Sequence, residues 1–105
     1  MNTASPPSAA LDRALAAAVD AYRARHPASA RQLELAAEVL PGGNTRSVLF
    51  QAPFPLAMVR GQGCRLWDAD GHEYLDALGE FTAGLYGHSA APIHQAIVEA
   101  LAGGI

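Results

Sequence analysis

Apolar side chains recur at helical spacing in the first forty residues of the chain. The first such stretch runs from Ser8 to about His26, and an amphipathic helix is predicted there. Pro27 should end this helix, because proline lacks the N–H that a helix interior needs. The apolar positions of the predicted helix are Leu11, Leu15, Ala18, Val19 and Tyr22.

A second, shorter helix is predicted after Pro27. Ser29 is expected to be its N-cap, because Gln32 follows at the spacing of a capping box. The sequence Pro-Gly-Gly at 41–43 should end it. Its apolar face would consist of Leu33, Ala36, Ala37 and Leu40.

After Gly43 the pattern changes to short apolar runs separated by glycine and proline. Strands are predicted near 56–60, 64–68 and 73–78. Gly-Gln-Gly at 61–63 should link the first pair, and Asp-Ala-Asp-Gly at 68–71 should link the second, since Asp-Gly is a hairpin turn signal. These elements form a three-stranded antiparallel meander.

The last part of the chain combines a glycine-rich loop at 79–91 with a helix. Pro92 suits the first turn of this helix, and Gly103 and Gly104 should cap its end. The overall prediction is an α+β fold with N-terminal helices, the meander and a C-terminal helix. The apolar face of the last helix would consist of Ile93, Ala96, Ile97, Ala100 and Leu101.

The length of 105 residues allows one small domain and is too short for two ordinary ones, and the composition is that of a globular chain with a thin core. Half of the 105 residues are hydrophobic, but many of these are alanine, which buries little area. Residues 1–7 are polar and proline-marked, and we expect them to be disordered. The net charge of −3 and the lack of a basic stripe argue against a nucleic-acid partner.

Neither a membrane nor a secretory route is indicated by the sequence. No apolar run approaches the roughly 20 residues needed to span a bilayer. The N-terminus has no basic start followed by an apolar run, as a signal peptide would. A single cysteine, Cys64, cannot form an internal disulfide. A cytoplasmic location is therefore expected.

All seven basic residues are arginine, and the chain contains no lysine. A mechanism that needs an amine side chain for a Schiff base cannot run on this chain alone.

The acidic stretch 68–76 could be a metal cage or a turn. A calcium loop of the EF-hand type needs glycine at position 6 and glutamate at position 12. Counted from Asp68, glycine comes at position 4 as Gly71, and position 12 is Gly79. The flanks also read as strands, whereas that motif needs helices. The hairpin is therefore the predicted structure, with aspartates that tolerate turn geometry.

The other chemical candidates form no complete catalytic constellation. His72, His88 and His94 are predicted to be solvated or structural histidines, because they lie in different elements. Cys64 is expected to be a small buried hydrophobe at a strand start. The residues alone therefore indicate a small α+β unit that is incomplete as an enzyme, with no metal site and no catalytic residue.

Two stretches, "LPGGNTRSVLF" and "RGQGCRLWDADGHEYLDALGEFTAGLYGHS", resemble the N-terminal part of class-III pyridoxal-phosphate aminotransferases. The glutamate-1-semialdehyde 2,1-aminomutase-like members are especially similar. The resemblance covers about residues 40–105, and residues 8–40 more loosely. It implies the beginning of a fold-type-I subunit: a helical arm at 8–43, then, at 44–105, the start of the small domain and the entry to a large domain.

The same resemblance implies a homodimeric enzyme that uses pyridoxal 5'-phosphate and acts on an amino acid or amino-ketone. The family's Schiff-base lysine, the acid at the pyridine nitrogen and the main phosphate loop all come later in the chain. The sequence would then be a fragment that is inactive and binds no cofactor by itself, with no cofactor-binding residue of its own.

Two substrate-binding residues are implied by the resemblance. Arg46 lies near the place of a carboxylate-binding arginine, although the family's arginine comes two residues later. Phe81 stands where the aminomutases have a pocket tryptophan. The alternatives are a surface arginine and a core phenylalanine. Ala90 and Ala91 replace the family's His-Pro, so the start of the last helix is expected to be shifted or weakened.

A different class of function remains open at this point. The chain could be an independent interaction module that pairs through the exposed edge of its meander.

Overall fold

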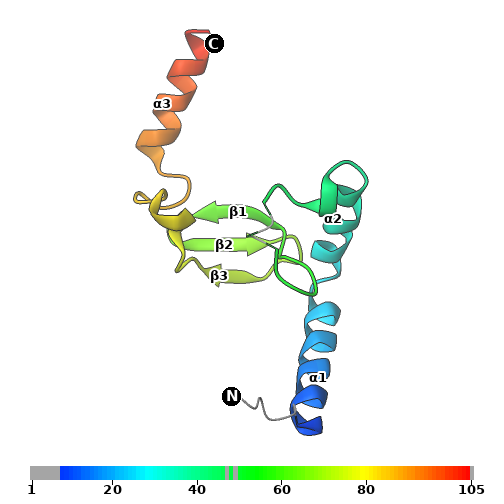
Figure 1. The fold of residues 1–105 in the computed structure, drawn as a ribbon. Helices are drawn as coiled ribbons and strands as arrows, with labels where there is room; N and C mark the ends of the chain where they lie inside the picture. The colour runs from blue at the N-terminus through cyan, green and yellow to red at the C-terminus, as the bar shows by residue number, and fades with distance from the viewer. Residues whose placement is uncertain (1–7, 47, 49, 105) are drawn as a thin grey trace, which may run out of the picture. The chain divides into compact units, whose positions relative to one another are not determined.

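The computed structural model describes residues 8–46, 48 and 50–104. The predicted disordered tail at 1–7 lies outside the described residues. The chain divides into two compact units with a boundary between Leu56 and Ala57. Figure 1 shows the helices and strands of both units. The division of the chain into an arm at 8–43 and a small-domain start at 44–105 stays a prediction.

The first helix, α1 (Ala9–Arg25), follows the prediction closely. Ser8 is its N-cap, and the hydroxyl oxygen of Ser8 accepts a hydrogen bond from Leu11 N at 3.2 Å. Asp12 lies in the first turn and Arg25 in the last. These charges oppose the helix dipole at each end and therefore favour the helix.

The second helix, α2 (Pro27–Ala37), begins earlier than predicted. The prediction of Ser29 as N-cap is wrong, because His26 is the N-cap and Ser29 is buried inside the helix. Pro27 ends one helix and begins the next: its missing N–H costs nothing in a first turn. The Pro41–Gly43 segment then forms a 3₁₀ turn, in which Gly43 has a φ of +68°.

The core of the first unit is small. The Tyr22 ring lies 5.1 Å from the Phe54 ring, and the Tyr22 hydroxyl donates to Phe54 O at 2.8 Å. Phe54 is the only hydrophobic residue that is buried within the described part of the chain. This confirms the prediction of a thin core.

The second unit contains the predicted antiparallel meander, with strand order β1-β2-β3 (Figure 1). The strands are β1 (Met58–Gln62), β2 (Arg65–Asp68) and β3 (Glu73–Leu75). The α+β fold class is therefore confirmed. Strand β1 starts two residues later than expected, and Val59 forms a bulge opposite β2.

The predicted Gly-Gln-Gly link at 61–63 is wrong. Gly61 pairs with Leu66 and Gln62 pairs with Arg65, so only Gly63 and Cys64 connect β1 and β2. A glycine is needed inside the strand for a packing reason. A Cβ atom at Gly61 would come within 2.7 Å of His88 Cγ.

The last helix, α3 (Ala91–Ala102), has Pro92 in its first turn, as predicted. Ala90 is its N-cap and provides no side-chain hydrogen bond. Every residue of α3 is exposed, including Ile93, Ile97 and Leu101 of the predicted apolar face. None of the helices in the described residues has the length and apolar character to cross a bilayer.

Candidate functional site

The acidic stretch forms the β2–β3 hairpin, which confirms the turn interpretation. Trp67 pairs with Glu73, and Asp68 N donates to His72 O at 3.1 Å, so the loop between the paired residues consists of Ala69, Asp70 and Gly71. Gly71 N donates to Asp68 O at 3.1 Å, and Gly71 has a φ of +87°. A three-residue loop of this type needs one residue in the left-handed region, which glycine adopts without strain.

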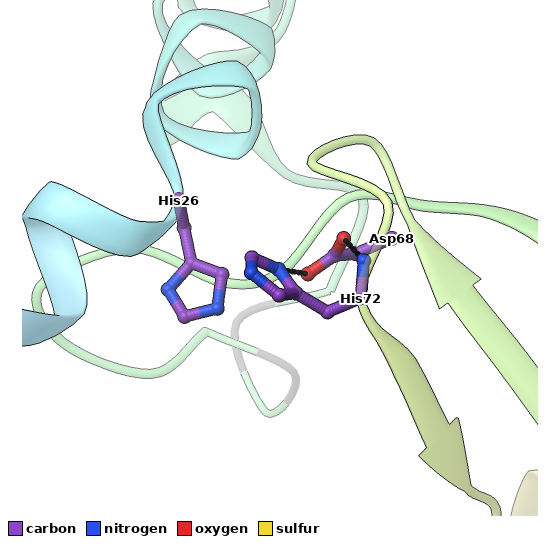
Figure 2. Close-up of side chains that lie close together, drawn as sticks. All are labelled: His26, Asp68 and His72. Atoms are coloured by element: carbon purple, nitrogen blue, oxygen red, sulfur yellow. Dashed lines mark hydrogen bonds and ion pairs between the residues drawn. The ribbon is translucent and has the colours of Figure 1, made fainter.

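Asp68 holds the hairpin together through both oxygens of its carboxylate. Oδ1 accepts hydrogen bonds from Asp70 N at 3.0 Å and His72 N at 2.8 Å. Oδ2 accepts from the Tyr74 hydroxyl at 2.7 Å and from His72 Nδ1 at 3.0 Å, a contact drawn in Figure 2. Asp68 is 1% exposed. The carboxylate is thus buried and accepts hydrogen bonds at both oxygens, which is a structural role.

These contacts set the charge state of Asp68. Burial by itself raises the pKa of the Asp68 carboxyl. The hydrogen bonds from Tyr74 and His72 have a larger, opposite effect, and together they lower this pKa to about 2. The carboxylate therefore stays ionised at neutral pH. A buried anion of this kind is tolerated only when its lone pairs are satisfied.

A second carboxylate–histidine pair joins β3 to the glycine-rich loop. His88 Nε2 lies 2.6 Å from Asp76 Oδ2. Asp76 Oδ1 accepts from Leu78 N at 3.0 Å and from Gly79 N at 2.9 Å. The bond from Gly79 N, followed by the one from His88, lowers the pKa of the Asp76 carboxyl. Strand β3 ends just before Asp76, because the Asp76 side chain accepts hydrogen bonds from the backbone of Leu78 and Gly79 and so forms a turn.

The predicted substrate residue Arg46 lies in the first unit. It is exposed and lines an open cavity of about 350 Å³, together with Leu40, Asn44 and Pro55. Within the described residues, its guanidinium has no hydrogen-bond or ion-pair partner. The group is therefore available for a ligand, and its role in substrate binding stays a prediction.

The other predicted substrate residue, Phe81, lies in the second unit. It is 60% exposed, which excludes the alternative of a core phenylalanine in this structure. Its φ of +55° places it in the left-handed region, between Glu80 at +53° and Thr82 at +75°. Three consecutive residues without glycine in this region are uncommon and energetically unfavourable. Phe81 and Arg46 thus belong to separate units.

The structure corrects one prediction and refines another. Cys64 is exposed, not buried, because it occupies the β1–β2 turn instead of a strand. His72 and His88 were predicted to be solvated or structural, and each is hydrogen-bonded to its own aspartate. Sequence reasoning missed the Asp76–His88 pair. The available signal was a short strand ending in aspartate, followed by Gly-His.

Comparisons with known proteins show what the chain is similar to. No protein-family model matches the sequence. The chain is 57% identical over 97 residues to a β-phenylalanine transaminase of Variovorax paradoxus, covering 92% of this chain and 22% of the relative. It is 39% identical over 107 residues to a glutamate-1-semialdehyde 2,1-aminomutase of Sorangium cellulosum, with 99% and 22% covered.

Solved structures agree with the sequence matches. The crystal structure of the Variovorax paradoxus β-phenylalanine aminotransferase matches 90% of this chain with a TM-score of 0.84 and 56% identity. An omega-transaminase from Sphaerobacter thermophilus matches 74% with a TM-score of 0.71 and 44% identity. These matches cover 22% and 18% of the known structures. The chain thus spans about one fifth of the length of its relatives.

Sequence and fold together identify the chain as a homologue of pyridoxal-phosphate-dependent transaminases of fold type I. Within that class, its relatives are class-III aminotransferases and glutamate-1-semialdehyde aminomutases, as the resemblance of its motifs implied.

Proposed function

We propose that this chain is part of a pyridoxal-phosphate-dependent aminotransferase subunit that moves the amino group of a β-amino acid. The observation that carries the proposal is the 57% identity to a β-phenylalanine transaminase over 92% of the chain. The identity to an aminomutase is lower, at 39%, so we favour transamination over internal amino exchange. A homodimer in the cytoplasm is the expected form of the whole enzyme.

The residues of this chain do not fit the cofactor itself. When bound, pyridoxal phosphate supplies an electron sink, and the protein must supply a Schiff-base lysine. The chain has seven basic residues, and all are arginine. No step through the cofactor is therefore assigned to these residues, and the isolated chain is expected to be inactive.

We propose that Arg46 binds the substrate carboxylate. Its guanidinium is exposed at an open cavity and has no partner among the described residues. A guanidinium pairs with a carboxylate through two parallel hydrogen bonds, which fixes the orientation as well as the charge. Such a contact would orient the amino group of the substrate in the complete enzyme.

We propose that Phe81 forms an aromatic wall beside the substrate. Its ring is largely exposed in the second unit and is free to be covered by an apolar group. An aromatic substrate side chain would bury a large area against such a ring. The name of the Variovorax paradoxus relative, a β-phenylalanine transaminase, supports this choice of substrate.

The test is an assay of the protein that carries this chain, in its full expressed length and with pyridoxal phosphate added. We expect amino transfer from β-phenylalanine to a 2-oxo acid. Turnover of glutamate-1-semialdehyde without any 2-oxo acid would show an aminomutase instead. Absence of both reactions would refute the proposal. Sedimentation of the same sample tests the dimer.

An interaction module remains the second candidate function, because strand β1 lies at an edge of the sheet with Met58 and Val59 exposed. A partner strand could pair with this edge. Replacing Val59 with proline would abolish such binding and leave an aminotransferase activity largely intact.

A further inference from the structure

The loop at residues 77–87, which overlaps the glycine-rich loop predicted at 79–91, is attached at both ends to one aspartate. At its start, Leu78 N and Gly79 N donate to Asp76 Oδ1 at 3.0 and 2.9 Å. At its end, His88 Nε2 reaches Asp76 Oδ2 at 2.6 Å. A single carboxylate therefore closes the loop, and each of its oxygens serves one end.

His88 is itself fixed to the β1–β2 hairpin. Its backbone exchanges two hydrogen bonds with Gly63, at 2.9 and 2.8 Å. Its ring lies so close to Gly61 that a Cβ atom there would be only 2.7 Å from His88 Cγ. The next residue, Ser89, donates its hydroxyl to Gly61 O at 2.8 Å. The imidazole thus has little freedom to move away from Asp76.

The middle of the loop needs such an attachment. Glu80, Phe81 and Thr82 all have positive φ, at 53°, 55° and 75°. Residues with a Cβ atom disfavour this region, so a free loop would relax to other conformations. Three internal backbone hydrogen bonds add to the closure. They run from Ala83 N to Glu80 O, from Gly84 N to Gly79 O and from Gly87 N to Gly84 O, at 3.3, 3.1 and 2.9 Å.

We propose that Asp76 and His88 form a latch that holds residues 77–87 in this conformation and so positions Phe81. Asp76 and His88 are positioning residues in this scheme, since they act through the loop. The value of the latch for substrate binding rests on the function proposed above for Phe81. The latch itself depends only on contacts within the second unit.

The geometry assigns the proton of the latch. A carboxylate only accepts hydrogen bonds, so His88 Nε2 must carry the hydrogen that lies toward Asp76. On the other side of the ring, His88 Nδ1 lies 3.7 Å from Glu80 Oε1. Cys64, Tyr86 and His94 are the other titratable residues that line the adjoining cavities. Protonation of Asp76 would remove the charge that holds the histidine, so acid should open the latch.

The experiment measures hydrogen exchange of peptides from residues 77–87 in the protein of full expressed length. His88→Ala should speed exchange of the loop by about tenfold or more, since a hydrogen bond to a charged group is lost. His88→Gln should restore much of the protection, because its side-chain amide can donate from nearly the same place. His94→Ala is the matched control and should leave loop exchange unchanged.

Asp76→Asn provides a second variant that keeps an oxygen for Leu78 N and Gly79 N. Its amide places a donor toward His88, so loop exchange should rise and should lose its dependence on acid. Equal loop exchange in the wild-type protein and in His88→Ala would overturn the latch. Failure of His88→Gln to restore protection would also overturn it, because ring volume would then be the cause.

The aminotransferase assay separates the two proposals. Faster loop exchange in a protein without transaminase activity would support the latch and refute the proposed function. Active enzyme with unchanged loop exchange in both variants would refute the latch alone. If both hold, His88→Ala should raise KM for β-phenylalanine more than it lowers kcat.

Discussion

Replacing Asp68 with asparagine should loosen the β2–β3 hairpin at neutral pH and much less in acid. Asparagine keeps an oxygen for Asp70 N and His72 N, but its amide group is a donor. That donor would face the Tyr74 hydroxyl and His72 Nδ1, which both donate to the wild-type carboxylate. The variant therefore loses the charge and two favourable contacts at once.

The size of this effect follows from the pKa of Asp68, which lies at about 2 compared with an ordinary value of 3.8. That difference corresponds to about 2 kcal/mol of stabilisation by the ionised form. Because the folded pKa is depressed, the stabilisation is fully present above pH 3.8 and is lost as pH falls toward 2. Roughly half of this stabilisation by ionised Asp68 should be lost by pH 3.

The assay is hydrogen exchange at the His72 amide, which donates to Asp68 Oδ1 at 2.8 Å. At pH 6 this amide should exchange about 30-fold faster in Asp68→Asn than in the wild type. At pH 3 the ratio should shrink to about fivefold. Asp20→Asn, at an exposed site on α1, is the control and should give a ratio near one. A ratio that is independent of pH would refute the reasoning.

Three further predictions concern the whole chain. Purified 105-residue chain should give no borohydride-reducible pyridoxal-phosphate adduct on any side chain, because it has no lysine; an adduct away from the α-amino group would contradict this. In the complete enzyme, Arg46→Ala should raise KM for carboxylate substrates by roughly tenfold to a hundredfold, whereas Arg31→Ala should not; equal kinetics would make Arg46 a surface residue. The isolated chain should be marginally folded and should associate, because ordering costs about 1–2 kcal/mol per residue and Phe54 is the only buried hydrophobic residue among those described; a monomer by size-exclusion chromatography with strong amide protection across 79–102 would disprove it.

The helices with clear end signals could be predicted from the sequence. Ser8 and the apolar repeat placed α1, and Pro92 and Gly103 placed α3. The start of α2 was missed because a proline that ends one helix can also begin the next, and local sequence does not distinguish the two. Such ambiguity is resolved only by the path of the chain after the proline.

The strand boundaries and the latch depend on contacts between distant residues. Gly61 reads as a turn glycine, but it lies inside β1 because the His88 ring occupies the space above it. The position of the His88 ring beside Gly61 also brings this ring into contact with Asp76. No spacing rule in the sequence predicts that contact. Cys64 was placed wrongly for a related reason, since moving the turn by two residues exposes it.

The short connections of the meander bear on how the chain folds during synthesis. Two residues link β1 to β2, and three residues lie between Asp68 and His72, the pair that closes the β2–β3 hairpin. Hairpins of this kind form in about 1–10 μs, whereas ribosomes add roughly 5–20 residues per second. Once these residues leave the ribosome, the strands can therefore sample their pairings thousands of times before the next residue arrives. An isolated two-stranded hairpin is only marginally stable, so an incorrect register of β1 and β2 can still dissociate. The arrival of β3 lets Asp68 accept hydrogen bonds from the turn and from Tyr74, and this step then selects the register.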